Sequence, residues 1–261
     1  MDKLGNKENK MITIIGSGFI GISLAKGLRL AKRDSEIIMI DKVAGEKDGF
    51  KISNDKKTAL QKSNIVILAV QKEDVFSVCS EIVPLLNKKD YIVVSVVAGL
   101  NLSQLQSYFQ KEISVSRVMP NIGMSVGYGL TAVCSNNKTT ENSIVELFSS
   151  VGKTIVLSED KFDAFTVLSG SGVAFVMRFM RAMEQAGVEI GFHTNQSRKI
   201  VNQVIKGAQK LLSSKGTNPE DEIDKVTTPK GITITGLNEM EHFGLTSAVT
   251  NGIVKAFEKL R

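Results

Sequence analysis

The sequence predicts an α/β protein in which a doubly wound parallel sheet is followed by an all-α region. Short runs rich in Ile and Val alternate with helix-like segments as far as about Leu157, and strand signals stop after about Asp160. A glycine-rich turn also joins the first apolar run to the first helical pattern. We therefore expect a flexible tail at 1–10, a sheet domain at 11–160 and a helical domain at 161–261.

The predicted strands are near-continuous apolar runs, which are typical of a parallel sheet buried on both faces. The runs cover residues 12–15, 36–40, 65–70, 91–96, 116–119, 131–134 and 154–157. Helical spacing of apolar residues predicts intervening helices at 21–30, 75–86, 102–109 and 141–149. This alternation of strands and helices favours a doubly wound α/β domain.

The second part of the chain predicts helices at 171–188, 195–215, 233–242 and 245–260. Residues 200–212 carry a clear amphipathic stripe, yet the region has no obvious closed core of its own. We therefore expect these C-terminal helices to pack against a second subunit, giving a homodimer or a higher homo-oligomer.

Composition narrows the choice of partner. Hydrophobic residues make up 42% and charged residues 23% of 261, and the net charge of +6 comes from lysines and arginines scattered among acids. With no Trp and 6% aromatics there are few stacking platforms, so we expect no nucleic-acid partner. No apolar run approaches about 20 residues and no secretory signal is evident, so we expect a cytoplasmic protein without a membrane partner. Cys79 and Cys134 are interpreted as reduced thiols, and no metal-ligand cluster stands out.

The first turn matches GxGxxG and runs Gly16, Ser17, Gly18, Phe19, Ile20, Gly21. It follows a strand and opens a helix, which is the context in which this motif holds a dinucleotide. The first glycine permits the tight turn, the second lets the backbone approach a pyrophosphate at the helix N-terminus, and the third lets helix and strand pack closely. The sequence therefore predicts a Rossmann-like domain with all six residues at the cofactor.

Asp41 ends the next predicted strand, about 20 residues after the motif, where an acid accepts hydrogen bonds from the adenosine ribose. A carboxylate repels a 2′-phosphate, which favours NADH, but Lys42 beside it offers a charge to that phosphate, so NADPH stays open. The ends of two later strands, Ala69-Val70 and Ala98-Gly99, should line the same crevice with small side chains.

Three further clusters rich in small and polar residues stand out, at 117–121, 168–172 and 224–233. We interpret the last two as loops entering helix N-termini, where free N–H groups suit a carboxylate, although capping by Ser and Thr is the simpler interpretation of each alone. His193 and His242 belong to no recognisable catalytic constellation.

These motifs in this order resemble the pyrroline-5-carboxylate reductase family over nearly the whole chain. The resemblance includes the glycine turn and the stretches at 97–100, 119–121, 169–172, 186–188, 208–212 and 226–234. It implies a helical domain that interlocks with a partner, and hydride transfer from NAD(P)H to the C=N carbon of L-1-pyrroline-5-carboxylate, giving L-proline. An imine nitrogen is basic, so the reaction mainly needs orientation of donor and acceptor.

The resemblance also implies roles for particular residues. Backbone N–H groups of Gly231, Ile232 and Thr233 are expected to hold the substrate carboxylate, with the Thr233 hydroxyl near the ring nitrogen as proton donor. The resemblance further places Ser171 and Gly172 at the border of the same pocket and Asn121 near the nicotinamide.

The chain departs from the family pattern at four places. Val173 replaces a proline, Lys230 replaces the first of two glycines, residues 71–73 replace Lys-Pro-Gln, and residues 122–123 replace Thr-Pro. Two other functions stay open. One is a non-catalytic or regulatory paralogue that binds a dinucleotide. The other is a β-hydroxyacid dehydrogenase-like enzyme, which commonly needs a lysine that the helix after Ser171 lacks before Lys199.

Overall fold

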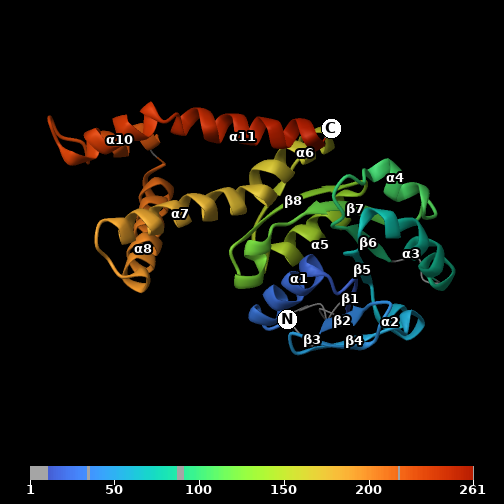
Figure 1. The fold of residues 1–261 in the computed structure, drawn as a ribbon. Helices are drawn as coiled ribbons and strands as arrows, with labels where there is room; N and C mark the ends of the chain where they lie inside the picture. The colour runs from blue at the N-terminus through green and yellow to red at the C-terminus, as the bar shows by residue number, and fades with distance from the viewer. Residues whose placement is uncertain (1–10, 34–35, 87–90, 217, 261) are drawn as a thin grey trace, which may run out of the picture. The chain divides into compact units, whose positions relative to one another are not determined.

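The computed structural model describes residues 11–33, 36–86, 91–216 and 218–260, so the predicted tail at 1–10 lies outside the described residues. The chain divides into two compact units, the first ending at Gly170 and the second running from Ser171 to Lys259. The first unit carries the sheet, and the described part of the second is helical (Figure 1).

The sheet of the first unit has nine strands in the order β3-β4-β2-β1-β5-β6-β7-β8-β9 within the described residues. Their bounds are β1 Ile12–Ile15, β2 Ile37–Ile40, β3 Gly45–Lys47, β4 Phe50–Ser53, β5 Ile65–Leu68, β6 Ile92–Ser95, β7 Ser114–Met119, β8 Gly129–Ser135 and β9 Gly152–Val156. The β3–β4 and β7–β8 pairs are antiparallel and the other pairs are parallel. The doubly wound α/β prediction is confirmed, but the sheet is mixed rather than wholly parallel.

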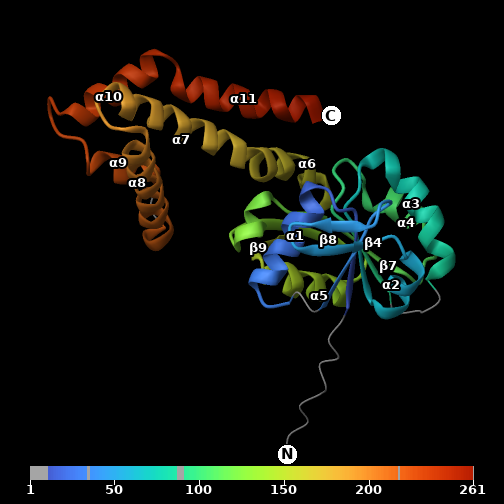
Figure 2. The same ribbon diagram turned by 60° about the horizontal axis from the view of Figure 1, so that its bottom comes forward.

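Helices cover both faces of this sheet, because successive strand residues point to opposite sides. Ile14 packs in a core with α1 and α5, whereas Ile15 packs in a second core with α2, α3 and α4. Figure 2 shows the two groups of helices on either side of the strands. The bounds are α1 Phe19–Leu30, α2 Lys56–Lys62, α3 Val75–Ile82, α4 Leu102–Ser107 and α5 Lys138–Ser149. Short 3₁₀ turns are η2 Lys72–Asp74, η3 Val83–Leu85, η4 Ile122–Val126 and η5 Glu159–Lys161.

The chain order places a topological switch point at β1. β1 pairs with β2 on one side and with β5 on the other, with Ile15 opposite both Ile40 and Leu68. The carboxyl ends of β1, β2 and β5 therefore meet at one edge, which is where open α/β sheets bind ligands.

The β3–β4 hairpin is an addition that the apolar patterns did not predict. Its turn is Asp48-Gly49, and both residues have positive φ (51° and 73°), as a type I′ turn requires. Lys47 pairs with Phe50 across it. All three residues of β3 are exposed, and the four-residue β4 alternates buried Phe50 and Ile52 with exposed Lys51, so neither strand is a continuous apolar run. The Asp-Gly dipeptide was the available signal.

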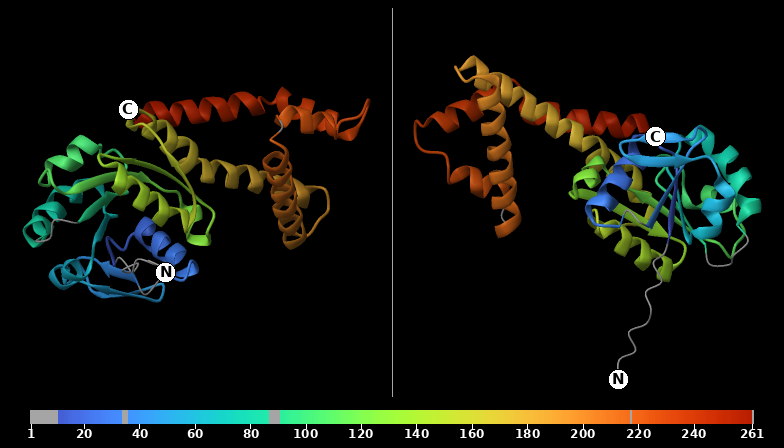
Figure 3. Two further views of the ribbon diagram at one scale, coloured as in Figure 1. Left: turned by 180° about the vertical axis from the view of Figure 1, so that it is seen from behind. Right: turned by 90° about the horizontal axis from the view of Figure 1, so that it is seen from below.

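The second unit contains α7 Gly172–Glu189, α8 Thr194–Lys215, α9 Pro219–Asp224, α10 Ile232–His242 and α11 Leu245–Leu260. Four of these match predicted helices, and the short α9 was missed. Among the described residues of this unit, Val201 is the one buried hydrophobic side chain. In Figure 3 the long helices of this unit do not close around a shared interior. The unit thus lacks a closed core of its own, as the sequence indicated.

A continuous helical stretch, Glu159–Glu189, corrects one prediction. It contains α6 Phe162–Phe165, a π-helical turn η6 Thr166–Ser171, and then α7. Residues 168–172 are therefore not a loop at a helix N-terminus: their backbone N–H groups lie inside a helix, because a π turn accommodates the small residues without ending it.

The same stretch is the one helix within the described residues that is long and apolar enough to cross a bilayer, judged by length and composition alone. Its mean hydropathy is 1.2 and 11% of its apolar window is buried. No uninterrupted apolar run is evident in the sequence of this stretch, because charged residues at both ends and at Arg178 and Arg181 interrupt the apolar residues.

Candidate functional site

The glycine turn has the geometry that a dinucleotide requires. Gly16 has φ +113°, and a Cβ there would lie 2.3 Å from the Ala69 carbonyl oxygen. A Cβ on Gly21 would lie 2.0 Å from the Gly16 carbonyl oxygen. Gly18 differs, because a Cβ there would meet no atom within 4 Å. Gly16 and Gly21 are therefore needed for close packing. Gly18 instead faces open space in which a ligand can approach the backbone.

Gly18 is also the N-cap of α1, and no side chain caps this helix. The first N–H groups of a helix have no intrahelical partner and carry partial positive charge. An anionic group at Gly18 would satisfy them. Phe19, the next residue, is 71% exposed, whereas Ile20 packs against the core.

The Asp41 carboxylate lies against the glycine turn. Its Oδ2 accepts hydrogen bonds from the Ser17 backbone N–H (2.6 Å) and hydroxyl (2.5 Å), and its Oδ1 accepts one from the Lys42 backbone N–H (2.7 Å). Burial disfavours the charged form, but the hydrogen bonds from Ser17 and Lys42 outweigh it and lower the pKa of Asp41. Asp41 is therefore a fixed anion beside the turn.

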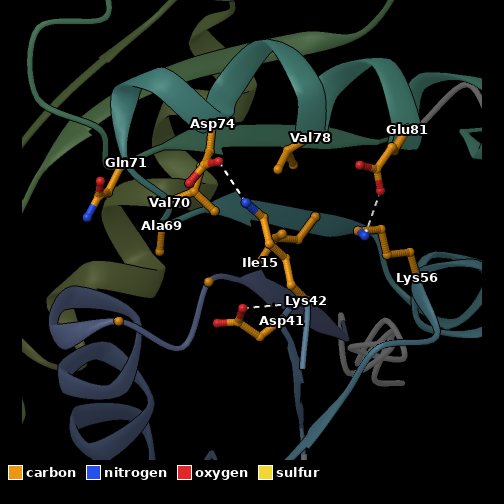
Figure 4. A pocket seen from close by; sticks show the side chains of 12 residues that line it. Ile15, Asp41, Lys42, Lys56, Ala69, Val70, Gln71, Asp74, Val78 and Glu81 are labelled. Atoms are coloured by element: carbon orange, nitrogen blue, oxygen red, sulfur yellow. Dashed lines mark hydrogen bonds and ion pairs between the residues drawn. The ribbon is translucent and has the colours of Figure 1, made fainter. Parts of the chain in front are cut away.

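A pocket opens at this edge of the sheet (Figure 4). It is lined by Ile15, Gly16, Gly18, Asp41, Lys42, Lys56, Ala69, Val70, Gln71, Asp74, Val78 and Glu81. Two ion pairs bridge residues on its rim: Lys42 Nζ to Asp74 Oδ1 at 2.7 Å and Lys56 Nζ to Glu81 Oε2 at 2.7 Å. The hydrogen bond that Lys42 donates to the Asp74 carboxylate is the main cause of the raised pKa of Lys42.

Six of the twelve predicted cofactor residues line the pocket, namely Gly16, Gly18, Asp41, Lys42, Ala69 and Val70. Ala69 and Val70 line the pocket, but Ala98 and Gly99 do not. Gly99 has φ +71°, and a Cβ there would lie 3.2 Å from the Lys72 ammonium group. The prediction missed Lys56, Asp74 and Glu81, which come from α2, η2 and α3. The polar run at 71–74, soon after β5, was an available signal for Asp74 alone.

Asn121 is buried at the end of β7 and its amide is fully engaged. Nδ2 donates to the Ser169 carbonyl oxygen (3.3 Å) and hydroxyl (3.1 Å), and Oδ1 accepts from the backbone N–H groups of Gly123 (3.1 Å) and Leu130 (3.3 Å). Ser171 ends the π turn and Gly172 begins α7, and both are half-buried. These three residues are expected at the substrate, and their roles stay predictions.

The loop before α10 matches the expected helix entry. Gly231 is the N-cap, no side chain caps the helix, and a Cβ on Gly231 would lie 2.4 Å from the Thr228 hydroxyl oxygen. The Gly231 N–H donates to the Thr228 carbonyl oxygen at 2.9 Å, so this N–H is used within the loop and is not free for a carboxylate. Ile232 and Thr233 occupy the first helical positions, whose N–H groups lack intrahelical partners. Lys230 adopts a left-handed conformation with φ 60°.

Metal ligands and histidines are further candidate site groups. No group of three or more His, Cys, Asp or Glu side chains that could hold a metal ion occurs in the part of the chain that the structure describes. His193 is the N-cap of α8 and His242 packs edge-on against Phe243. The residues that line the pocket include no histidine.

The fold and the glycine turn define a Rossmann-like dinucleotide-binding protein with a helical C-terminal unit. Family models agree with this division: residues 11–99 match the model described as NADP oxidoreductase coenzyme F420-dependent, and residues 159–261 match pyrroline-5-carboxylate reductase dimerisation. Pyrroline-5-carboxylate reductase 2 of Dictyostelium discoideum is 34% identical, with 97% of this chain and 93% of that protein covered. The enzyme of that name from Aquifex aeolicus is 32% identical, with 96% of each covered. The chain belongs to the pyrroline-5-carboxylate reductase family.

Solved structures agree with the sequence relatives. The Plasmodium falciparum pyrroline carboxylate reductase with NADP bound superposes with a TM-score of 0.88 at 27% identity, covering 97% of each chain. The 1-pyrroline-5-carboxylate reductase of Streptococcus pyogenes gives a TM-score of 0.82 at 28% identity, covering 97% of this chain and 98% of that one. The resemblance stated from the motifs is therefore confirmed.

Proposed function

We propose that this chain transfers a hydride from NADH or NADPH to the C=N carbon of L-1-pyrroline-5-carboxylate and releases L-proline. It is an NAD(P)-dependent oxidoreductase of proline biosynthesis. The observation that carries the proposal is the match to pyrroline-5-carboxylate reductases at 30–34% identity over 95–97% of the chain, joined to an open glycine cradle.

The residues present fit a dinucleotide. Open space at Gly18 and the uncapped N-terminus of α1 suit a pyrophosphate, and the fixed Asp41 carboxylate suits ribose hydroxyl groups. Ala69 and Val70 offer small side chains at the strand ends. When bound, the cofactor supplies the hydride.

The substrate carboxylate is assigned to the N-terminus of α10. The N–H groups of Ile232 and Thr233 are available there, and the helix dipole favours an anion. Gly231 does not offer its own N–H to the carboxylate, because that N–H donates to the Thr228 carbonyl oxygen. Its contribution is the turn that leads into α10. Holding the carboxylate fixes the orientation of the ring, which is the main requirement of the reaction.

The Thr233 hydroxyl is assigned to the ring nitrogen, where it holds or donates a proton. An imine nitrogen is basic enough to be protonated before reduction, so a strong acid is not required. Ser171 and Gly172 are assigned to the border of the same pocket and Asn121 to the nicotinamide end. All of these assignments rest on the family resemblance.

We also propose a homodimer formed through the C-terminal helices of domain 161–261. Apolar side chains repeat on the exposed faces of α7, α8 and α11, including Met177 (56% exposed), Val204 (50%) and Val249 (52%). Exposed apolar stripes of this kind mark interaction surfaces. A dimer interface would account for the apolar stretch Glu159–Glu189 without a membrane. We propose a cytoplasmic location on this basis.

The dimer is tested by light scattering after size-exclusion chromatography. Val204→Glu should shift the mass toward the monomer, because a charge would be buried at the interface. Val126→Glu, at a 61% exposed position in the first unit, is the matched control and should leave the mass unchanged. A monomeric unmodified protein without detergent would contradict the proposal, and recovery in the membrane fraction would contradict the location.

The activity is tested with purified protein, pyrroline-5-carboxylate and each reduced cofactor, scoring both cofactor oxidation and proline. We expect proline in an amount equal to the cofactor oxidised. Cofactor binding without proline formation would overturn the proposal and favour the non-catalytic paralogue. Oxidation of the reduced cofactor by the carbonyl form of a β-hydroxyacid, and not by pyrroline-5-carboxylate, would favour the dehydrogenase-like alternative.

A further inference from the structure

We propose that this chain binds NADH more tightly than NADPH, and that Asp74 is a specificity-determining residue because it forms an ion pair with the ammonium group of Lys42. The inference rests on the proposed function, since it concerns the cofactor of the same site. NADPH differs from NADH only by a phosphate on the adenosine ribose. Charges around that ribose therefore decide the preference.

Asp41 presents a fixed negative charge at the end of β2. Three of the roughly four lone-pair positions of a carboxylate are already used, two by Ser17 and one by the Lys42 N–H. One position remains, which can accept a hydrogen bond from a ribose hydroxyl. A 2′-phosphate has no proton to donate there at neutral pH and would meet a like charge.

Lys42 is the neighbouring cation that could compensate this repulsion, but its ammonium group points away from Asp41 and toward η2. Figure 4 shows the side chain extending to Asp74, with Nζ and Oδ1 2.7 Å apart. To reach a phosphate at the ribose, Lys42 must leave Asp74, and Asp74 then stays behind as a second acid beside the ligand.

The other charges of the pocket do not reverse this balance. Lys56 is paired with Glu81 in the same way. The lining residues include two lysines and three acids, one net negative charge, which disfavours an added phosphate dianion. Lys47 in β3 is a further cation near Asp41, but its Nζ is already held by the Ser17 carbonyl oxygen at 2.9 Å.

The expected size of the effect follows from exposure. The side chains of Lys42 and Asp74 are 68% and 39% exposed, so solvent screens the pair. Exposed ion pairs contribute little, and a change of about fivefold in relative affinity is therefore the appropriate expectation for Asp74 at low salt. The direct repulsion by Asp41 should be larger, at about tenfold or more.

The experiment measures dissociation constants of NADH and NADPH by nicotinamide fluorescence and calorimetry, without substrate. The unmodified protein should bind NADH about tenfold more tightly than NADPH. Asp74→Asn frees Lys42 and should reduce the NADH preference about fivefold. Glu81→Gln is the matched control, because it also removes one acid from the pocket but frees Lys56 instead, and it should change the preference less than twofold.

Two results would overturn the inference: tighter binding of NADPH by the unmodified protein, or equal shifts in Asp74→Asn and Glu81→Gln. The second result would mean that total charge, not the Lys42–Asp74 pair, sets the preference. Because binding is measured without substrate, this outcome is independent of whether proline forms. A protein that selects NADH but makes no proline would keep this inference and contradict the proposed function.

Discussion

The Asn121 side chain joins the end of β7 to the π turn through two hydrogen bonds to one residue, the carbonyl oxygen and the hydroxyl of Ser169. Its own oxygen accepts the N–H groups of Gly123 and Leu130. The amide has two donors and an oxygen with two lone pairs, so no capacity is left over. Any effect of Asn121 on a ligand therefore acts through the position of these neighbours.

Asn121→Leu keeps the shape of the side chain but removes all four hydrogen bonds. We expect the free energy of unfolding to fall by about 2 kcal/mol or more, because buried N–H and hydroxyl groups lose their partner. Chemical denaturation measures this change. Ser169→Ala, which removes one acceptor and leaves the carbonyl bond, should cost about 1 kcal/mol. Equal losses in both variants would show that the hydroxyl bond carries the link.

The fold of the first unit was largely predictable, because buried parallel strands leave continuous runs of Ile and Val. β1 begins and ends at the predicted residues, Ile12 and Ile15. In the β3–β4 hairpin, β3 has three exposed residues and therefore no apolar pattern, whereas β4 alternates buried Phe50 and Ile52 with exposed Lys51, which is not a continuous apolar run. The π turn was missed for a different reason: small residues at 168–172 have the same composition in a loop and in a widened helical turn.

The candidate site was predictable where one residue type is physically required. Gly16 and Gly21 leave no room for a Cβ, and Asp41 stands at a fixed distance along a βαβ unit. The ion pairs of the pocket rim were not predictable, because Lys42 and Asp74 are far apart in the sequence and meet only through the sheet order β2-β1-β5.

Thr233→Val tests the proposed proton donor, since it preserves the branched shape and removes the hydroxyl. We expect kcat/KM for pyrroline-5-carboxylate to fall about 100-fold, the usual scale for a positioned proton donor, while the dissociation constant of NADH stays the same. Thr235→Val is the matched control on the same helix, because the Thr235 hydroxyl bonds the Gly231 carbonyl oxygen (3.0 Å). Unchanged turnover in Thr233→Val would remove this hydroxyl from the mechanism.

Asp41 should titrate below the ordinary aspartate range. Burial alone would raise the pKa, but hydrogen bonds from Ser17 and Lys42 lower it. A depressed folded-state pKa means that Asp41 stabilises the protein above its unfolded pKa of about 3.9 and loses that contribution as the pH falls through the folded value. The stability gap between the unmodified protein and Asp41→Asn should therefore shrink below about pH 4.

The carboxyl carbon shift of Asp41 in an NMR titration measures this pKa directly. Ser17→Ala removes the hydroxyl bond and should move the midpoint upward, while the backbone bond from residue 17 remains. A midpoint at or above the ordinary aspartate value in the unmodified protein would contradict the geometry at the glycine turn.

Lys230 holds a left-handed backbone conformation (φ 60°) directly before Gly231, and such a conformation costs a side chain with a Cβ about 1–2 kcal/mol. Lys230→Gly should remove that strain. Glycine also makes the unfolded chain more flexible, which returns about 0.5–1 kcal/mol, so the net stabilisation should be about 0.5–1 kcal/mol by chemical denaturation.

Lys230→Ala distinguishes the effect of the charge from the effect of the backbone conformation, because alanine keeps the Cβ and loses the amine. It should give no stabilisation. If the substrate carboxylate binds at the N-terminus of α10, both variants lose a nearby cation and should raise KM about two- to fivefold with little change in kcat. A raised KM in the glycine variant alone would instead assign the effect to loop conformation, because only glycine relaxes φ at this position.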